Sequence, residues 1–224
     1  HPDQAVTFFE ANTSPGEVVW RARAVPAPEG RRMAVATAMG TAVRLGIVAA
    51  GALAEALAAP AHAELFYLIV GGLGGEDAYA ERFDKDAAAL ADVARRTTAD
   101  SRVTLLKGEG ATREAVVKAF DALRTRTKAA DNVIVMFIGH GSYDGETYKL
   151  NLPGPDLDGA EIAKLLEAIP ARSQLVVNAT SASGAILETW AGEGRTLITA
   201  TRSGFERNAT RFAEHFAAAL AEGS

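Results

Sequence analysis

Apolar and polar positions alternate along the chain in two distinct periods from residue 64 onward. Short runs of almost continuous apolar residues have the length of buried strands, and they lie at 64–71, 102–107, 132–138, 174–179 and 196–201. Between them, apolar residues recur every three to four positions, which predicts helices at 78–97, 112–128, 159–169, near 185–191 and at about 208–221. A hairpin-like piece is expected at 145–154. Uninterrupted apolar strands separated by helices are typical of a mostly parallel sheet covered on both faces, so we predict an α/β three-layer sandwich.

Residues 33–63 have a different pattern from the rest of the chain. Arginines stand in front of an apolar segment at 45–59, and Ala61-His62-Ala63 then places small residues at the two positions that a signal peptidase reads. The apolar segment is shorter than the ~20 residues that a membrane span needs. We therefore interpret 33–63 as an export signal, which predicts a periplasmic or secreted protein with no stable membrane span in its mature chain. A buried or membrane-anchoring helix is the alternative interpretation.

This interpretation divides the chain into three parts. Residues 1–32 lie upstream of the signal and receive no function, 33–63 are removed on export, and 64–224 form the folded domain. No strand follows the last predicted helix, which is compatible with a domain that is truncated at its C-terminus.

Composition narrows the chemistry that is open to this domain. The chain has 224 residues, of which 48% are hydrophobic, and a formal net charge of −5. A negative chain of this kind does not have the basic footprint of a nucleic-acid-binding protein. It contains no cysteine, which excludes disulfides, thiolate metal sites and a cysteine nucleophile. Because the chain has only four histidines, candidates for a metal ligand or a general base are few, and we predict neither a metal nor a cofactor.

A glycine-rich segment, "VGGLGGEDAY", follows the first predicted strand and invites comparison with phosphate-binding loops. The G-x-G-x-x-G pattern is not met, because the third glycine position after Gly72 and Gly74 is Asp77. No Gly-Lys-Ser/Thr follows, and the acidic pair Glu76 and Asp77 would repel a pyrophosphate. We interpret the segment as a tight turn between a strand and a helix.

Two other predicted strands each end in small residues and one chemically capable side chain. The strand at 132–138 is followed by Gly139-His140-Gly141-Ser142, and the strand at 174–179 by Thr180-Ser181-Ala182-Ser183-Gly184. Taken separately, a turn histidine that caps a carbonyl and serines that cap a helix explain these residues. Neighbouring parallel strands lie about 4.8 Å apart, so the two tips together place a base, a nucleophile and free amides near one substrate atom. Acyl transfer requires that combination.

The two motifs resemble those of the caspase-like cysteine peptidases, most closely the legumain family. In that family one strand ends in His-Gly, often His-Gly-Ser, and the next strand ends in a small residue, the catalytic Cys, any residue and Ser-Gly. The segments "FIGHGS" and "ATSASG" match these motifs, with Ser181 in the place of the cysteine. The resemblance covers about 64–216 and includes "LNLPGPDLDGAEIAKLLEAI" between the two tips. It implies a caspase-like fold and peptide or protein substrates.

The resemblance also implies a role for each residue of the site. His140 would be the acid/base, Ser181 would occupy the nucleophile position, and the N–H groups of Gly141 and Ser181 would form the oxyanion hole. Arg82 looks like the basic residue of the legumain specificity pocket, and an ordinary surface arginine on a helix is the alternative. Ala179 stands where legumains carry an acidic residue, so this part of the pocket departs from the family.

The exchange of serine for cysteine predicts weak or absent activity. A thiol has a pKa of about 8.5 and forms a thiolate even when the histidine is not in contact, whereas a hydroxyl needs a base within hydrogen-bond reach. The spacing does not show which of Asp144, Asp156 or Asp158 would orient His140. The hypotheses are a peptidase that has lost its cysteine, a working serine hydrolase, and a peptide-binding pseudoenzyme. A flavodoxin-like domain that binds a small molecule at its strand tips is a further alternative, and the oligomeric state stays open.

Overall fold

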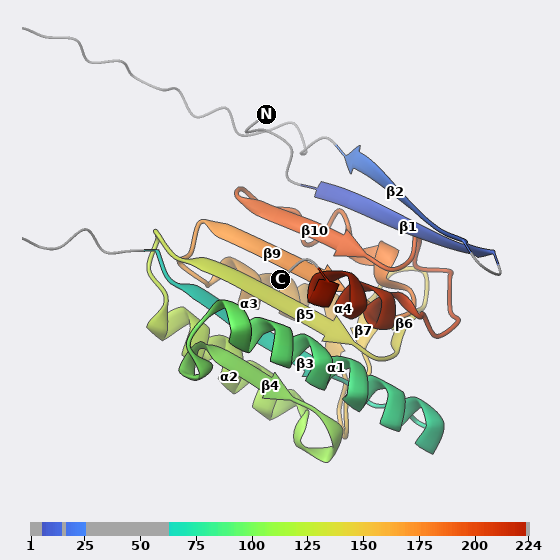
Figure 1. Ribbon diagram of the computed structural model, residues 1–224, viewed down its shortest axis with the longest axis horizontal. Helices are drawn as coiled ribbons and strands as arrows, with labels where there is room; N and C mark the ends of the chain where they lie inside the picture. The colour runs from blue at the N-terminus through green and yellow to red at the C-terminus, as the bar shows by residue number, and fades with distance from the viewer. Residues whose placement is uncertain (1–5, 15–16, 26–62, 223–224) are drawn as a thin grey trace, which may run out of the picture. The chain divides into compact units, whose positions relative to one another are not determined.

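The computed structural model describes residues 6–14, 17–25 and 63–222. In the last of these segments, five strands form one sheet in the order β10-β9-β5-β3-β4 (Figure 1). The strands are β3 (Leu65–Gly71), β4 (Val103–Leu106), β5 (Asn132–Ile138), β9 (Ser173–Asn178) and β10 (Arg195–Thr199). Each lies where an apolar run predicted a strand, and every neighbouring pair is parallel. The prediction of an α/β fold built on a mostly parallel sheet is confirmed.

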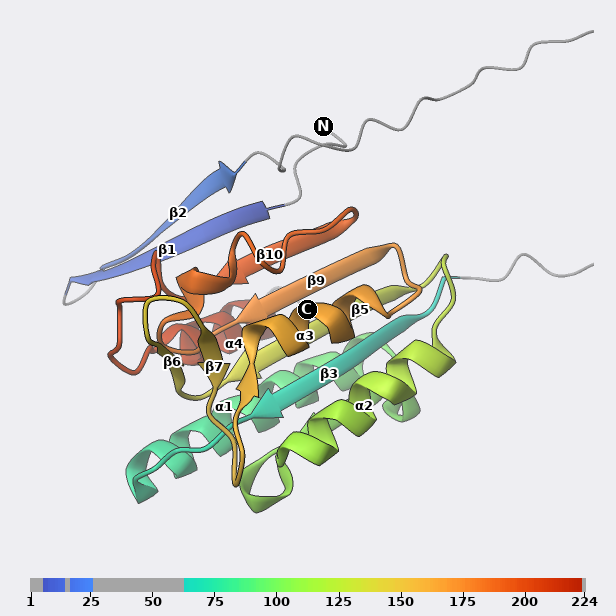
Figure 2. The same ribbon diagram turned by 180° about the vertical axis from the view of Figure 1, so that it is seen from behind.

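Helices cover both faces of this sheet, which gives three layers (Figures 1 and 2). One face carries α1 (Asp77–Thr97) and α4 (Phe212–Glu222), and the other carries α2 (Arg113–Arg126) and α3 (Gly159–Glu167). Alternate residues of β3 point to opposite faces. Leu68 belongs to the core beneath α2 and α3, whereas Tyr67 and Ile69 belong to the core beneath α1 and α4. Each strand is buried on both sides, which is why its apolar run is uninterrupted.

A small antiparallel sheet follows β5. It consists of β6 (Gly141–Tyr143), β7 (Tyr148–Leu150) and β8 (Leu157–Asp158), and it includes the hairpin-like piece expected at 145–154. Because β6 begins directly after His140, this sheet starts at the tip of β5. Asp158 then caps α3, its carboxylate accepting the Glu161 amide at 2.7 Å. The chain returns through α3 to β9, the neighbour of β5.

Two helical predictions differ from the structure. The pattern near 185–191 predicts a helix, but the chain forms a short 3₁₀ turn, η3 (Ser183–Ile186), because the Gly184 amide bonds to the Thr201 hydroxyl of another segment. The last helix begins at Phe212 rather than at about 208, since residues 206–210 form an irregular segment that is hydrogen-bonded to the turn after β9. In both places, contacts with distant residues override the apolar spacing.

The N-terminal part of the chain is described as a hairpin. β1 (Val6–Ser14) and β2 (Glu17–Val25) pair antiparallel, in a region to which the sequence pattern assigned no element. The export signal predicted at 33–63 lies outside the described residues, apart from Ala63. Among the helices that the structure describes, none is long and apolar enough to cross a membrane.

Candidate active site

The predicted pair of side chains lies at the carboxyl edge of the main sheet. β5 and β9 are neighbours, and Phe137 stands opposite Asn178 in their register. The chain leaves β5 through Gly139, whose φ of +136° favours glycine over other residues, and His140 follows at once. On the next strand, the Ala179 amide still donates to the Phe137 carbonyl at 2.8 Å before the chain turns. Two turns that are distant in the sequence therefore meet at one edge.

His140 Nδ1 and Ser181 Oγ are 3.5 Å apart. The structure thus brings together the two residues that the sequence analysis paired. The separation exceeds the roughly 2.6–3.2 Å expected between a general base and the group whose proton it removes. Such a contact suits a thiol, which ionises without close approach of the base, better than it suits a hydroxyl.

Aromatic side chains of α1 hold the imidazole of His140. The rings of Tyr79 and Phe83 each meet it edge-on, with centroids 5.1 Å away. Burial lowers the pKa of His140, and the positive charge of Arg82 lowers it further, while a hydrogen bond with the Gly74 backbone and the charge of Glu76 act in the opposite direction. The neutral imidazole, which is the form that accepts a proton, is therefore favoured at neutral pH.

Gly141 packs against the turn at 180–184 that follows β9, called the nucleophile turn below because it contains Ser181. A β-carbon at Gly141 would lie 2.5 Å from the Ser181 carbonyl oxygen and 2.7 Å from the Thr180 hydroxyl. Any larger residue would push β6 away from the turn, so the close approach of the two strand tips requires glycine here. This approach brings Gly141 next to Ser181, as the sequence analysis expected.

Residues 206–210 pass beside Ser181. The Ala182 amide donates to the Glu206 carbonyl at 2.8 Å, and the Thr210 hydroxyl donates to the Ala179 carbonyl at 2.6 Å. These two bonds lie on either side of Ser181 along the chain, and Ser181 is 1% exposed. Position 181 is therefore enclosed by the segment 206–210 in addition to Gly141.

Arg82, the predicted specificity residue, shares the aromatic contacts of His140. Its guanidinium carbon lies 5.1 Å from the ring centroid of Tyr79 and 5.3 Å from that of Phe83. Nη2 donates to the Thr210 carbonyl at 3.3 Å, while Nε is buried and has no hydrogen-bond partner. A buried donor without a partner is uncommon in proteins, and this one stands beside the candidate base.

The carboxylates considered as a third member of a triad bind other groups. Asp144 accepts the Glu146 amide at 2.9 Å, Asp156 accepts the Leu152 amide at 3.1 Å, and Asp158 caps α3. Each is thus engaged with the backbone of its own segment. In the part of the chain that the structure describes, no cluster of three or more His, Asp or Glu side chains is arranged to hold a metal ion.

Sequence reasoning did not identify Tyr79, Phe83 or Thr210 as neighbours of the site. The place of Tyr79 and Phe83 could have been predicted, because they lie four positions apart in a predicted helix and so share one helix face beside Arg82. No sequence pattern predicted the place of Thr210, because the path of its segment depends on contacts with strand ends such as the bond to the Ala179 carbonyl. The alternative interpretation of Ser181 as a helix cap is wrong, because no side chain caps η3.

No protein family model matches this chain. No curated protein matches it. Among solved structures, one that is similar is protein GSU0716 from Geobacter sulfurreducens, with 22% sequence identity and a TM-score of 0.43 over 53% of this chain and 50% of that chain. The chain therefore spans about half the length of that protein. A likeness of this extent carries no argument about activity.

Proposed function

We propose that residues 64–224 form a peptidase-type domain, caspase-like and closest to the legumain family, that binds peptides and cleaves them weakly or not at all. The observation that carries this proposal is the 3.5 Å contact between His140 Nδ1 and Ser181 Oγ at the tips of adjacent parallel strands. The order and register of "FIGHGS" and "ATSASG" support it.

The proposed chemistry is attack of the Ser181 hydroxyl on a peptide carbonyl. Neutral His140 would accept the hydroxyl proton and return it to the leaving amine, and the N–H groups of Gly141 and Ser181 would stabilise the oxyanion. The 3.5 Å separation and the 1% exposure of Ser181 both act against this step. We therefore expect this chain, with serine at position 181, to react far more slowly than a chain with cysteine at the same position.

Arg82 is the proposed substrate-binding residue. Its Nε is buried without a partner, and its Nη2 bond to a carbonyl is long, at 3.3 Å. A carboxylate or amide oxygen of a peptide side chain would supply an acceptor for these donors. Peptides with an acidic or amide side chain at the cleavage point should therefore bind better than peptides with a basic one.

The variant Ser181→Cys tests the proposal directly. Sulfur forms a longer bond to carbon than oxygen does, and the thiol ionises where the hydroxyl does not. We expect this variant to cleave peptides, and we expect the addition of His140→Ala to abolish the cleavage. Ser142→Cys is the matched control, because Ser142 is exposed on β6 and lies outside the nucleophile turn.

A serine-directed fluorophosphonate probe separates the alternatives. Labelling of Ser181 that is lost with His140→Ala would favour a working serine hydrolase. No labelling, together with activity in Ser181→Cys, would favour a peptidase that has lost its cysteine. Micromolar peptide binding without either result would favour a pseudoenzyme. A chain that is unlabelled, stays inactive as Ser181→Cys and binds no peptide would contradict the proposal, and would leave the flavodoxin-like alternative.

Export is a separate part of the proposal and depends on residues 33–63 alone. We expect N-terminal sequencing of the protein, expressed from a gene that includes this segment, to give a mature chain that begins at Glu64 outside the cytoplasm. Recovery of an uncleaved cytoplasmic chain would contradict export and leave the proposal for the domain unaffected.

A further inference from the structure

The backbone at Ala182, directly after Ser181, is left-handed. Its φ of +55° is positive, and no other non-glycine residue in the described part of the chain has a positive φ. For an L-residue with a β-carbon this conformation costs about 1 kcal/mol. Such a conformation persists where surrounding contacts hold it in place, often at functional sites. The turn that places Ser181 therefore depends on its neighbours.

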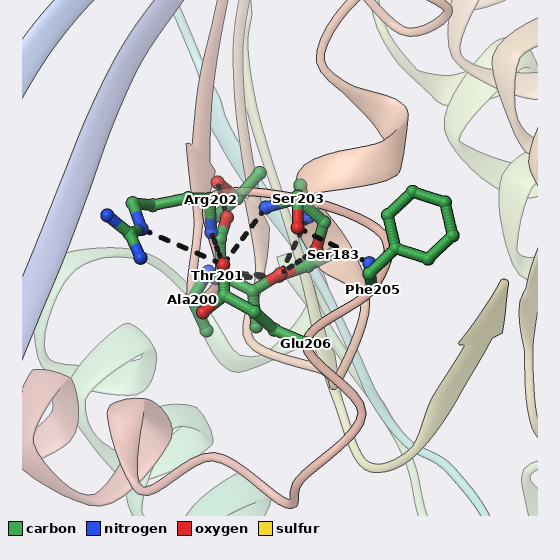
Figure 3. A network of polar contacts seen from close by, with 9 residues as sticks. Ser183, Ala200, Thr201, Arg202, Ser203, Phe205 and Glu206 are labelled. Atoms are coloured by element: carbon green, nitrogen blue, oxygen red, sulfur yellow. Dashed lines mark hydrogen bonds and ion pairs between the residues drawn. The ribbon is translucent and has the colours of Figure 1, made fainter. Parts of the chain in front are cut away.

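Hydrogen bonds from the segment after β10 hold this turn. Ser183 Oγ accepts the amides of Ala200 and Thr201, both at 3.1 Å, and lies 3.2 Å from the Thr201 hydroxyl oxygen. Thr201 Oγ1 in turn accepts the Gly184 amide at 2.8 Å. Figure 3 shows these side chains facing one another. Ser183 is 0% exposed and Thr201 4% exposed, so water does not replace these bonds.

The same segment bonds to the other side of the turn. The Ala182 amide donates to the Glu206 carbonyl at 2.8 Å. The Glu206 carboxylate accepts the amides of Arg202 and Ser203 at 3.0 and 3.2 Å, which closes the segment into a compact loop (Figure 3). The segment 201–206 therefore accepts hydrogen bonds from the turn at both the Ala182 amide and the Gly184 amide.

Ser183 does not act as a helix cap. η3 has Ala182 at its N-cap position with no side-chain cap, and the bonds of Ser183 go to the segment after β10 instead. A serine in this position thus ties one strand end to another. This explains in physical terms why the second motif places Ser and Gly after the nucleophile position: the hydroxyl receives two amides, and a β-carbon at Gly184 would lie 2.3 Å from the Ser203 nitrogen.

We propose that Ser183 and Thr201 are positioning residues, which fix Ser181 against His140 by tying the left-handed turn to residues 201–206. This inference rests on the role proposed above for Ser181. A misplacement of the reacting group by about 1 Å is enough to reduce a rate about a hundredfold. Loss of either hydroxyl should therefore affect the reactivity of the group at position 181 without any direct contact with substrate.

The test uses the full chain with Ser181→Cys, in which the new thiol is unique because the sequence contains no cysteine. Its alkylation by iodoacetamide is measured over a pH series, alone and with Ser183→Ala or Thr201→Val. We expect each added substitution to slow alkylation at neutral pH about tenfold or more and to raise the pKa of the thiol. Thr201→Ser keeps the hydroxyl and should keep the parent rate. In peptide cleavage, kcat should fall while KM stays the same.

Ser183→Ala and Thr201→Val change buried residues and could fail to fold, so Glu206→Ala serves as a second variant. The Glu206 side chain is exposed, and its loss should leave the fold intact. The substitution opens the loop at 202–206 and should slow alkylation less than Ser183→Ala does. An unchanged or faster alkylation rate in folded Ser183→Ala, Thr201→Val and Glu206→Ala would overturn the positioning role. If Ser181→Cys neither cleaves nor binds peptide but the three substitutions still slow its alkylation, the positioning role stands and the proposed function fails.

Discussion

The two ends of the main sheet differ in how they treat buried polar groups. At the amino end, Asp131 stands directly before β5 and accepts two backbone amides at 2.8 and 2.9 Å. Arg195, at the start of β10, donates to the Gln174 side chain at 2.9 Å and to the Trp190 carbonyl at 2.7 Å. These buried groups are bonded to one another and to the backbone, which is the arrangement expected of a structural end.

The carboxyl end is different. Within the described residues, three buried side-chain atoms have no hydrogen-bond partner: Arg82 Nε, Asn151 Oδ1 and Asn178 Nδ2. All three lie at this end, since Arg82 follows β3, the Asn151 amide bonds to the His140 carbonyl, and Asn178 ends β9. Unsatisfied buried groups are retained where binding or catalysis uses them, and ligands of parallel sheets bind at this edge. The buried polar groups named at the amino end are thus paired, whereas the carboxyl end, where the proposed site lies, leaves three without a partner.

Arg195→Met should have the largest effect on stability and none on the site. It leaves the Gln174 oxygen and the Trp190 carbonyl without a donor in the core, which should lower the free energy of unfolding by about 3 kcal/mol. Urea denaturation measures this change, and Arg96→Met on the exposed surface of α1 is the control. Alkylation of the thiol in Ser181→Cys should stay the same under native conditions. Slower alkylation of this thiol in Arg195→Met would contradict the conclusion that the amino end of the sheet does not affect the group at position 181.

Tyr148→Phe should have a smaller effect that depends on pH. The buried hydroxyl bonds to Thr180 at 2.7 Å, and its loss should cost about 1 kcal/mol at neutral pH. Burial raises the pKa of Tyr148 to about 12, compared with about 10 in an unfolded chain. The folded state holds its proton longer, so this contribution to stability is present below pH 10 and is lost as the pH rises through about 12.

Denaturant unfolding at neutral and alkaline pH measures this difference. Tyr148→Phe should remove part of the alkaline loss of stability, whereas Tyr143→Phe should keep it, because Tyr143 is only partly buried. Equal alkaline losses in the two variants would contradict a buried, protonated Tyr148 beneath the nucleophile turn.

Arg82→Met should have the smallest effect, confined to the carboxyl end. Removing the cation takes away one of the causes that lower the pKa of His140, so this pKa should rise toward its ordinary value. An NMR titration of the imidazole measures the shift. Arg211→Met is the control, because Arg211 pairs with Glu214 on α4 and does not contribute to the His140 shift. An unchanged or lower pKa of His140 in Arg82→Met would contradict the predicted action of Arg82 on this imidazole.

Much of the architecture could be predicted from the sequence, because the local spacing of apolar residues distinguishes strands from helices. The central residues of β3, β5 and β9 form uninterrupted apolar runs. Runs of this kind are typical of a parallel sheet that is covered on both faces. The places of His140 and Ser181 at strand tips were also predictable, since each follows one of these strands. That the two tips are neighbours follows from the strand order. The prediction from spacing failed at η3 and at the start of α4, where contacts with distant residues set the local structure.

The sequence by itself determined which side chains stand at strand tips and that the sheet is parallel, because the period of apolar positions is a local property. Only the tertiary structure decided that β5 and β9 are neighbours and that α1 lays Tyr79 and Phe83 against His140, with Arg82 over the same two rings. It also decided that the segment 201–210 encloses the turn at Ser181. These depend on strand order and on hydrogen bonds between residues far apart in the chain, such as Ser183 with Thr201. No local period encodes bonds of that kind, because their partners are far apart in the sequence.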